Sequence, residues 1–161
     1  MTMKVLAICG LAVGFVSFVM GVVGLCTNNW RTGDTHSIGL WKRCEASGCN
    51  DIQVGQKKQE YFAFETIRGF GILAVAMAFA GMVFGIVSLI KTKKIGPSVV
   101  ATFYMMGALF SLICASVFTS LSHSVNTSWG YSFILTWIAF PLSLIAGVMM
   151  IVVTFSTKDD E

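Results

Sequence analysis

Four long apolar segments without any charged residue or histidine dominate the sequence, and they constrain the fold more than any other feature. They cover residues 5–26, 69–90, 99–121 and 133–155. Each is long enough to cross the roughly 30 Å hydrocarbon core of a bilayer, which takes about 20 residues of α-helix. The segments do not alternate apolar and polar residues as barrel strands do, so we predict four transmembrane helices.

The composition agrees with a membrane protein. Charged residues make up 12% of the chain, whereas a soluble domain carries about 25%. So few charges cannot cover a soluble globule of 161 residues. The first apolar segment follows Lys4, but it is longer than the roughly 7 to 15 apolar residues of a signal peptide, so we interpret it as a retained helix.

The distribution of lysine and arginine predicts the orientation. The short connection after the second segment carries Lys91, Lys93 and Lys94, whereas the connection 122–132 has no lysine or arginine. The positive-inside rule therefore predicts that both termini are cytosolic and that 27–62 and 122–132 are extracellular loops. This arrangement is expected of a multi-pass protein of the plasma membrane.

Both predicted outer loops carry features of an extracellular compartment. Cys44 and Cys49 in the first loop suit a small disulfide-closed turn in an oxidising environment. A sequon makes Asn126 in the second loop a glycosylation candidate. In the first loop, residues 35–42 have the composition of a strand, and 53–54 could pair with it weakly.

Arg68 is the charged residue nearest to an apolar segment on the outer side. Glu65 lies three residues earlier, on the same helical face, so the two side chains can pair. We interpret Arg68 as a tie that hydrogen-bonds loop carbonyls and holds the outer loop on the helices. The alternative is ordinary snorkelling of the arginine toward the membrane surface.

Glycines recur four residues apart in the first two segments, as Gly10 and Gly14 and as Gly81 and Gly85. Such spacing lets membrane helices approach closely. The general abundance of glycine in membrane helices explains the pattern equally well.

The residue types exclude several functions. The apolar segments hold no ionisable group for a proton relay or an ion pathway. We find no zinc or nucleophile constellation, so we expect no enzyme, no metal site and no cofactor. The net charge of +3 is too small to indicate nucleic-acid binding. Membrane lipids and other proteins are the expected partners.

The order of residues in the first outer loop resembles the signature of the claudin superfamily. That superfamily includes claudins, peripheral myelin protein, the epithelial membrane proteins, the lens fibre membrane protein and channel gamma subunits. The positions that carry the resemblance are Trp30, Gly39, Leu40, Trp41, Cys44 and Cys49. Arg68 resembles the arginine at the start of the second helix, and residues 129–137 resemble the start of the fourth helix. The short chain and the cysteine spacing are nearest to the lens and epithelial membrane protein branch.

The resemblance implies a fold. It is an all-α membrane protein, a left-handed bundle of four transmembrane helices with a small extracellular antiparallel β-sheet. The disulfide would join two strands of that sheet, and Trp41 would pack where the sheet meets the membrane. The charged end of the chain, 158–161, lacks the hydrophobic terminal residue with which claudins bind PDZ scaffolds, so no such scaffold is expected.

The resemblance also implies a function through protein–protein contacts. We predict cell–cell adhesion, junction formation or membrane organisation by self-association within one membrane or between two. One alternative is an auxiliary, gamma-type subunit of an ion channel or receptor. A second alternative is a paracellular barrier or pore, but the loop 27–62 has five basic and four acidic residues, which indicates no strong ion selectivity.

Overall fold

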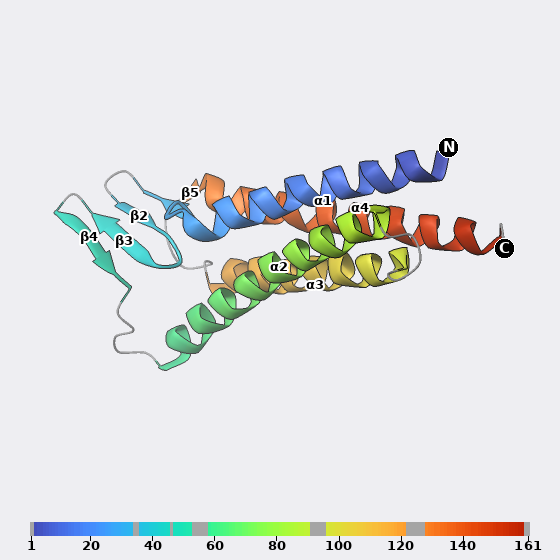
Figure 1. The fold of residues 1–161 in the computed structure, drawn as a ribbon. Coiled ribbons are helices and arrows are strands. Elements are labelled where there is room, and N and C mark those ends of the chain that lie inside the picture. The colour runs from blue at the N-terminus through green and yellow to red at the C-terminus, as the bar shows by residue number, and fades with distance from the viewer. Residues whose placement is uncertain are drawn as a thin grey trace.

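Four long helices lie side by side, and a small sheet covers one end of them (Figure 1). The computed structural model describes residues 2–33, 36–45, 47–52, 58–90, 96–121 and 128–159. The helices are α1 (Thr2–Cys26), α2 (Lys58–Ile90), α3 (Pro97–Leu121) and α4 (Tyr131–Asp159). Helix α1 packs against α4, α2 packs against α3, and α3 packs against α4. Both chain termini lie at the end opposite the sheet (Figure 1).

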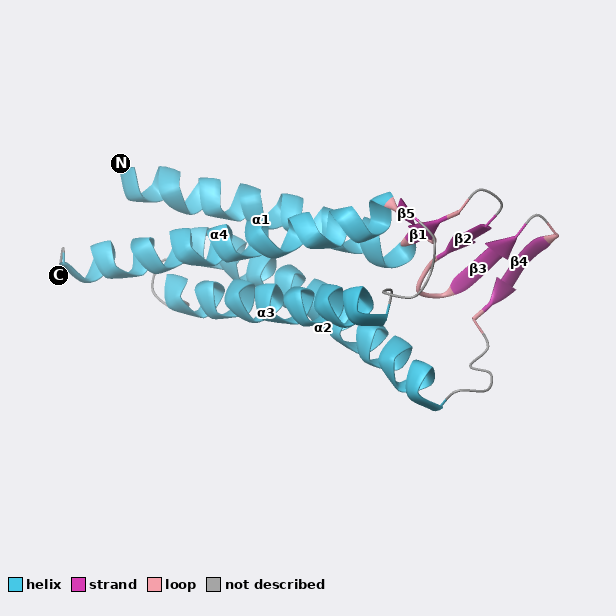
Figure 2. Ribbon diagram, turned by 180° about the vertical axis from the view of Figure 1, so that it is seen from behind, coloured by secondary structure: helices cyan, strands magenta, loops and turns pink. Residues whose placement is uncertain are grey.

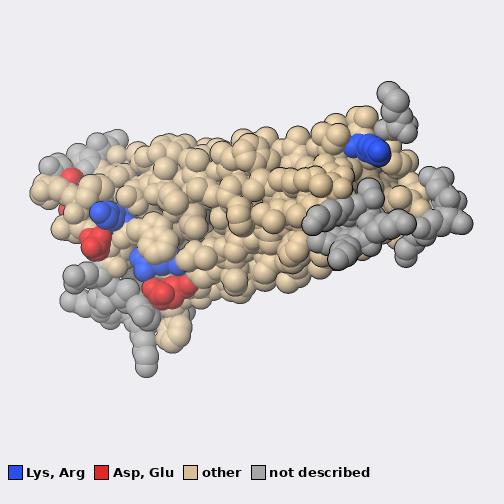
Figure 3. Space-filling view, in the orientation of Figure 1, with Lys and Arg blue, Asp and Glu red and all other residues tan. Residues whose placement is uncertain are grey.

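All four helices are long and apolar enough to cross a membrane. A helix is the expected form for these segments because a backbone in lipid must satisfy its hydrogen bonds within the segment. Figure 3 shows charged side chains gathered mainly at the sheet end and a long stretch of the visible face without any charge. The predicted fold class is confirmed: four membrane-spanning helices carry a small antiparallel sheet.

Helix α2 begins at Lys58, earlier than the predicted segment 69–90. The added turns contain charged and polar residues, which lower the hydropathy but do not prevent a helix. Figure 2 shows these turns extending beyond the neighbouring end of α3 and away from it. As a result Arg68 lies inside a continuous helix rather than at its start.

The sheet has five short strands in the order β4-β3-β2-β1-β5, and every neighbouring pair is antiparallel. Four strands lie between α1 and α2, and the fifth directly precedes α4. Their bounds are β1 (Arg31–Thr32), β2 (His36–Ile38), β3 (Lys42–Glu45), β4 (Gly48–Asp51) and β5 (Ser128–Trp129). Strand β5 therefore brings the two predicted outer loops into one structure.

The single strand predicted over 35–42 is wrong. The structure has two strands there, β2 and β3, which pair with each other through a turn at Gly39, Leu40 and Trp41. The amide of Gly39 donates to the carbonyl of Lys42 (N···O 2.9 Å), which closes this turn. The predicted partner 53–54 lies outside the described residues.

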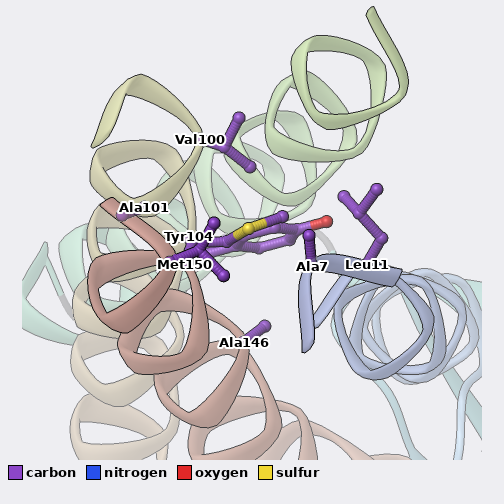
Figure 4. Close-up of a cluster of buried hydrophobic side chains, with 8 residues drawn as sticks. Ala7, Leu11, Val100, Ala101, Tyr104, Ala146 and Met150 are labelled. Carbon is purple, nitrogen blue, oxygen red and sulfur yellow. The ribbon is translucent and has the colours of Figure 1, made fainter. Parts of the chain in front are cut away.

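Near the termini the core is built around Tyr104 of α3, which is fully buried (Figure 4). Its ring occupies space that glycines leave on two other helices. A Cβ at Gly14 would lie 2.3 Å from the ring, and one at Gly81 would lie 3.2 Å from it. A Cβ at Gly85 would lie 2.1 Å from the Leu11 side chain. Gly14, Gly81 and Gly85 therefore make room for large side chains of neighbouring helices.

Hydroxyl groups link the helices midway along the bundle. Ser17 of α1 donates to the carbonyl of Ala139 (2.8 Å), and its oxygen lies 2.9 Å from that of Ser143 in α4. Ser111 of α3 donates to the carbonyl of Thr136 in α4 (3.3 Å). Each such bond between membrane helices contributes about 0.6 kcal/mol. Together they hold α4 in place between α1 and α3.

Candidate functional site

The last turn of α1 accepts hydrogen bonds from the loop that follows it. A helix leaves its last four carbonyls without partners inside the helix. Here Thr27 donates to Val23 through its amide (3.1 Å) and its hydroxyl (2.6 Å). The indole of Trp30 donates to the Gly24 carbonyl (2.8 Å), and the indole of Trp41 donates to the Leu25 carbonyl (2.8 Å). The two motif tryptophans therefore act as a cap for this helix end.

The two tryptophans differ in what surrounds their rings. Trp30 is fully buried and packs against Phe118 and Phe133, with ring centroids 4.7 Å and 6.0 Å away. Trp41 is 38% exposed, in the turn between β2 and β3. Truncation of a buried Phe or Trp side chain to alanine typically costs about 3 to 5 kcal/mol. Trp30 is thus the main apolar anchor of the sheet, whereas Trp41 holds the turn to α1 and stays partly exposed.

The turn at Gly39 and Leu40 brings the sheet onto the helices. A Cβ at Gly39 would lie 2.4 Å from the Cα of Asn28, so only glycine allows this approach of the two backbone segments. Leu40 follows with a fully buried side chain in the cluster that contains Trp30 and Ile67 of α2. Each residue of the motif therefore has a steric or hydrogen-bonding reason for its identity.

Arg68 of α2 holds the same turn from the other side. Its Nε and Nη2 atoms donate to the Leu40 carbonyl at 2.9 Å and 2.7 Å. Its Nη1 pairs with Glu65 at 2.9 Å, and its guanidinium lies 5.0 Å from the centre of the Trp41 ring. A single side chain therefore contacts the loop carbonyl, a carboxylate and the motif tryptophan. The structure brings together the predicted residues Arg68, Glu65, Leu40 and Trp41.

The outermost part of the sheet is the hairpin of β3 and β4. Cys44 and Cys49 face each other in its register and form a disulfide. Gly48 has a φ of 135°, a conformation that favours glycine and that closes the turn. All four residues of β4 are exposed, and β4 is an edge strand of the sheet within the described part of the chain. The hairpin is the most accessible part of the outer structure.

The second outer segment joins the sheet through Arg31, which sequence reasoning missed. Arg31 is the partner of Trp129 in the β1–β5 register, and its guanidinium lies 4.8 Å from the centre of that ring. Trp129 in turn stacks on Phe133, with ring centroids 4.3 Å apart. Burial lowers the pKa of Arg31 from its usual value because water no longer solvates the charge fully.

Backbone contacts complete this junction. The amide of Gly130 donates to the Trp30 carbonyl (3.0 Å), and the amide of Ser132 donates to the Asn29 carbonyl (3.1 Å). A Cβ at Gly130 would lie 1.9 Å from the Asn29 oxygen, so a side chain does not fit here. The hydroxyls of Thr27 and Ser132 lie 2.6 Å apart. The start of α4 is thus fixed against the end of α1.

We refer to the five strands, Trp30, the turn 39–41 and the Arg68 contact as the sheet cap. Asn126, the glycosylation candidate, lies outside the described residues. The signal that could have revealed the Arg31–Trp129 contact is weak, because each residue is also common at a membrane surface.

A comparison of the sequence with known families decides the classification. The model of the PMP-22/EMP/MP20/Claudin family matches residues 3–150. The chain belongs to this family. The resemblance inferred from the loop motif is therefore confirmed.

Curated relatives include epithelial membrane proteins. Epithelial membrane protein 2 of Danio rerio is 28% identical over 146 residues, which cover 84% of this chain and 88% of that protein. Epithelial membrane protein 1 of Homo sapiens is 29% identical over 153 residues, which cover 87% of this chain and 91% of that protein. Epithelial membrane protein 1 of Oryctolagus cuniculus is 28% identical over 165 residues, covering 93% and 98%. These relatives agree with the epithelial part of the predicted lens and epithelial membrane protein branch.

Proposed function

We propose that this family member acts through protein–protein contacts of its sheet cap on the outside of the cell, in cell–cell adhesion, junction formation or membrane organisation. The observation that carries the proposal is the exposed β3–β4 hairpin on a cap that hydrogen-bonds to α1 and α2 and packs through Trp30 on α3 and α4. A surface held in one conformation loses little conformational entropy when it binds a partner. The hairpin is the part of the cap that such a partner reaches first.

The side chains of the hairpin suit a polar contact. Lys42 and Asp51 are opposite each other in the register, and both are exposed. Arg43 pairs with Glu45 (3.0 Å), and about half of each side chain is exposed. Charges of both signs on a small surface favour specific orientation of a partner more than raw affinity. They fit a contact with a second copy of the chain, which offers the same two signs.

We also propose the plasma membrane as the location, with both termini in the cytosol. The disulfide supports an oxidising compartment for the cap. The termini lie at the opposite end of the bundle (Figure 1), which agrees with the lysine distribution of the sequence. Self-association within one membrane or between two membranes is the expected mode of action.

Expression in cells that do not aggregate by themselves tests the adhesive function. Two differently labelled populations that both express the full chain should form mixed clusters, with the protein concentrated at the contacts. Mixed cultures in which one population lacks the protein distinguish contact with a second copy from contact with another surface molecule. Dispersed cells despite a normal amount of surface protein would contradict adhesion between membranes.

Purification from native membranes in mild detergent tests the alternatives. We expect oligomers of this chain. A stoichiometric channel or receptor partner would instead support an auxiliary subunit. Electrical resistance across a monolayer that expresses the chain would identify a barrier or pore, which the proposal does not require.

A further inference from the structure

A groove between α3 and α4 lies on the membrane-spanning part of the bundle. Its volume is about 420 Å³, and sites for small molecules span about 300 to 1,000 Å³. All of its lining residues belong to the segments Pro97–Leu121 and Tyr131–Thr157, which are long and apolar enough to cross a membrane. A lipid is therefore the class of molecule that surrounds this groove.

The hydroxyl-bearing residues of the lining lie toward one end of the groove. Ser98, Thr102 and Thr154 are on the side of the bundle end that carries both termini, where the apolar Ala101 and Phe155 also lie, since α3 begins and α4 ends there. Met105, Met106 and Ile151 lie farther toward the middle of the helices. Methionine adapts its shape to an irregular apolar surface. The groove thus suits an amphiphile whose polar group lies toward the end that carries the termini.

Two hydroxyls restrict the chemistry of that polar group. Thr102 donates its hydrogen to the Ser98 carbonyl (3.0 Å), and Thr154 donates to the Met150 carbonyl (2.9 Å). A hydroxyl has one hydrogen and two lone pairs, so both threonine oxygens can still accept but no longer donate. The ester and phosphate oxygens of a glycerophospholipid only accept, and they do not complement these oxygens. Ser98 also lines the groove, and its hydroxyl can donate as well as accept. A polar group that both donates and accepts, as a hydroxyl does, therefore complements this end of the groove best.

The groove also selects by charge. None of the described residues that line it is charged. A buried or half-buried charge without a partner is costly, so an uncharged polar group is favoured. A sterol combines a single neutral hydroxyl with a rigid apolar body. We propose that the α3–α4 groove binds a sterol whose hydroxyl donates to Thr102 or Thr154 and whose rings lie along Met105, Met106 and Ile151.

Photolabelling of the purified full chain in phosphatidylcholine nanodiscs tests the proposal. The probe is cholesterol with a diazirine group on its apolar body, and peptide mass spectrometry locates the label. We expect labelled peptides from 98–106 and 151–155, and loss of the label when unlabelled cholesterol is added. Label spread over all four helices, or label displaced by sphingomyelin rather than by cholesterol, would overturn it.

A pair of isosteric substitutions tests the hydrogen bond. Thr102→Val combined with Thr154→Val removes both acceptors and should weaken binding roughly threefold, the worth of one hydrogen bond inside a membrane. Thr119→Val is the matched control, because Thr119 makes the same bond to Ala115 (2.8 Å) at the other end of α3. Equal binding by the double variant and the control would contradict the assigned acceptors.

A second copy of the chain is the competing occupant. Met106→Cys places a thiol in the groove, and oxidation would link two chains if their grooves met. A disulfide-linked dimer through this position, insensitive to added cholesterol, would replace the sterol with a protein contact. We expect monomers at this position and unchanged sterol labelling of the remaining peptides.

Discussion

At the sheet end of the bundle, side chains donate hydrogen bonds to backbone carbonyls, whereas near the termini a tyrosine fills the space that glycines leave. Trp30, Trp41 and Arg68 each need a particular direction of approach. Tyr104 needs only a matching volume at Gly14 and Gly81. Directional bonds fix the orientation of the sheet cap, and steric fit sets the spacing of the helices. The comparison predicts that the two ends respond differently to small changes of chemistry.

The largest effect is expected at the cap. Trp30→Ala removes a fully buried ring and a donor to α1, and it should lower the free energy of unfolding by about 3 to 5 kcal/mol. Unfolding in mixed micelles of increasing denaturing detergent measures the change. Phe62→Ala is the control, because that side chain is 62% exposed. Equal loss in both variants would mean that Trp30 is no special anchor.

Overfilling should show the steric character of the other end. Gly14→Ala places a Cβ within 2.5 Å of the Tyr104 ring and should cost about 1 to 3 kcal/mol. Gly69→Ala is the matched control, since nothing lies within 4 Å of its Cβ. Combining Gly14→Ala with Tyr104→Leu should recover part of the loss. If the free-energy changes of the two single substitutions simply add in the double variant, the two residues do not share this space.

Removing the directional hydrogen bonds of Arg68 while keeping most of its side-chain volume should destabilise the cap. Arg68→Met keeps the apolar stem but leaves the Leu40 carbonyl without its donors, which should cost about 1 to 2 kcal/mol. Glu65→Gln should cost less than about 1 kcal/mol, because the Glu65 side chain is 48% exposed. The same detergent unfolding compares the two. A larger loss of stability for Glu65→Gln than for Arg68→Met would mean that the ion pair, and not the bond to the Leu40 carbonyl, holds the loop.

The smallest effect is expected from a change of chemistry at the other end. Among the described residues, the Tyr104 hydroxyl is buried without a hydrogen-bond partner. Tyr104→Phe removes this oxygen and keeps the ring, so stability should stay the same or rise by up to about 1 kcal/mol. A clear loss of stability would reveal a polar contact of Tyr104 and weaken the contrast between the two ends.

Hydropathy was sufficient to predict the helices, because an apolar segment in lipid has few other options. The charged first turns of α2 escaped this signal. The hairpin of β2 and β3 was missed because its turn includes the contact of Gly39 with Asn28, eleven residues earlier, which only the folded loop reveals. The fit of Tyr104 to Gly14 was missed for a similar reason, since it joins residues of different helices.

The candidate site was predictable where a motif existed. Arg68 and the Gly39-Leu40-Trp41 turn were both named from the sequence, and the structure places them in direct contact. Arg31 and Trp129 were not paired, because their contact joins two loops that only the folded bundle brings together. The roles of all these residues in cell contacts stay predictions.

A glycan on the hairpin tests most directly whether the cap makes the contacts. Asn50 lies on exposed β4, and Ile52→Thr places a threonine two residues after it, which completes a glycosylation sequon. Ile52→Val is the matched control, because valine has the shape of threonine but forms no sequon. We predict a glycosylated variant that reaches the cell surface in normal amounts and no longer clusters cells, whereas the valine variant clusters them fully. Full clustering by the glycosylated variant would contradict a contact through the β3–β4 hairpin.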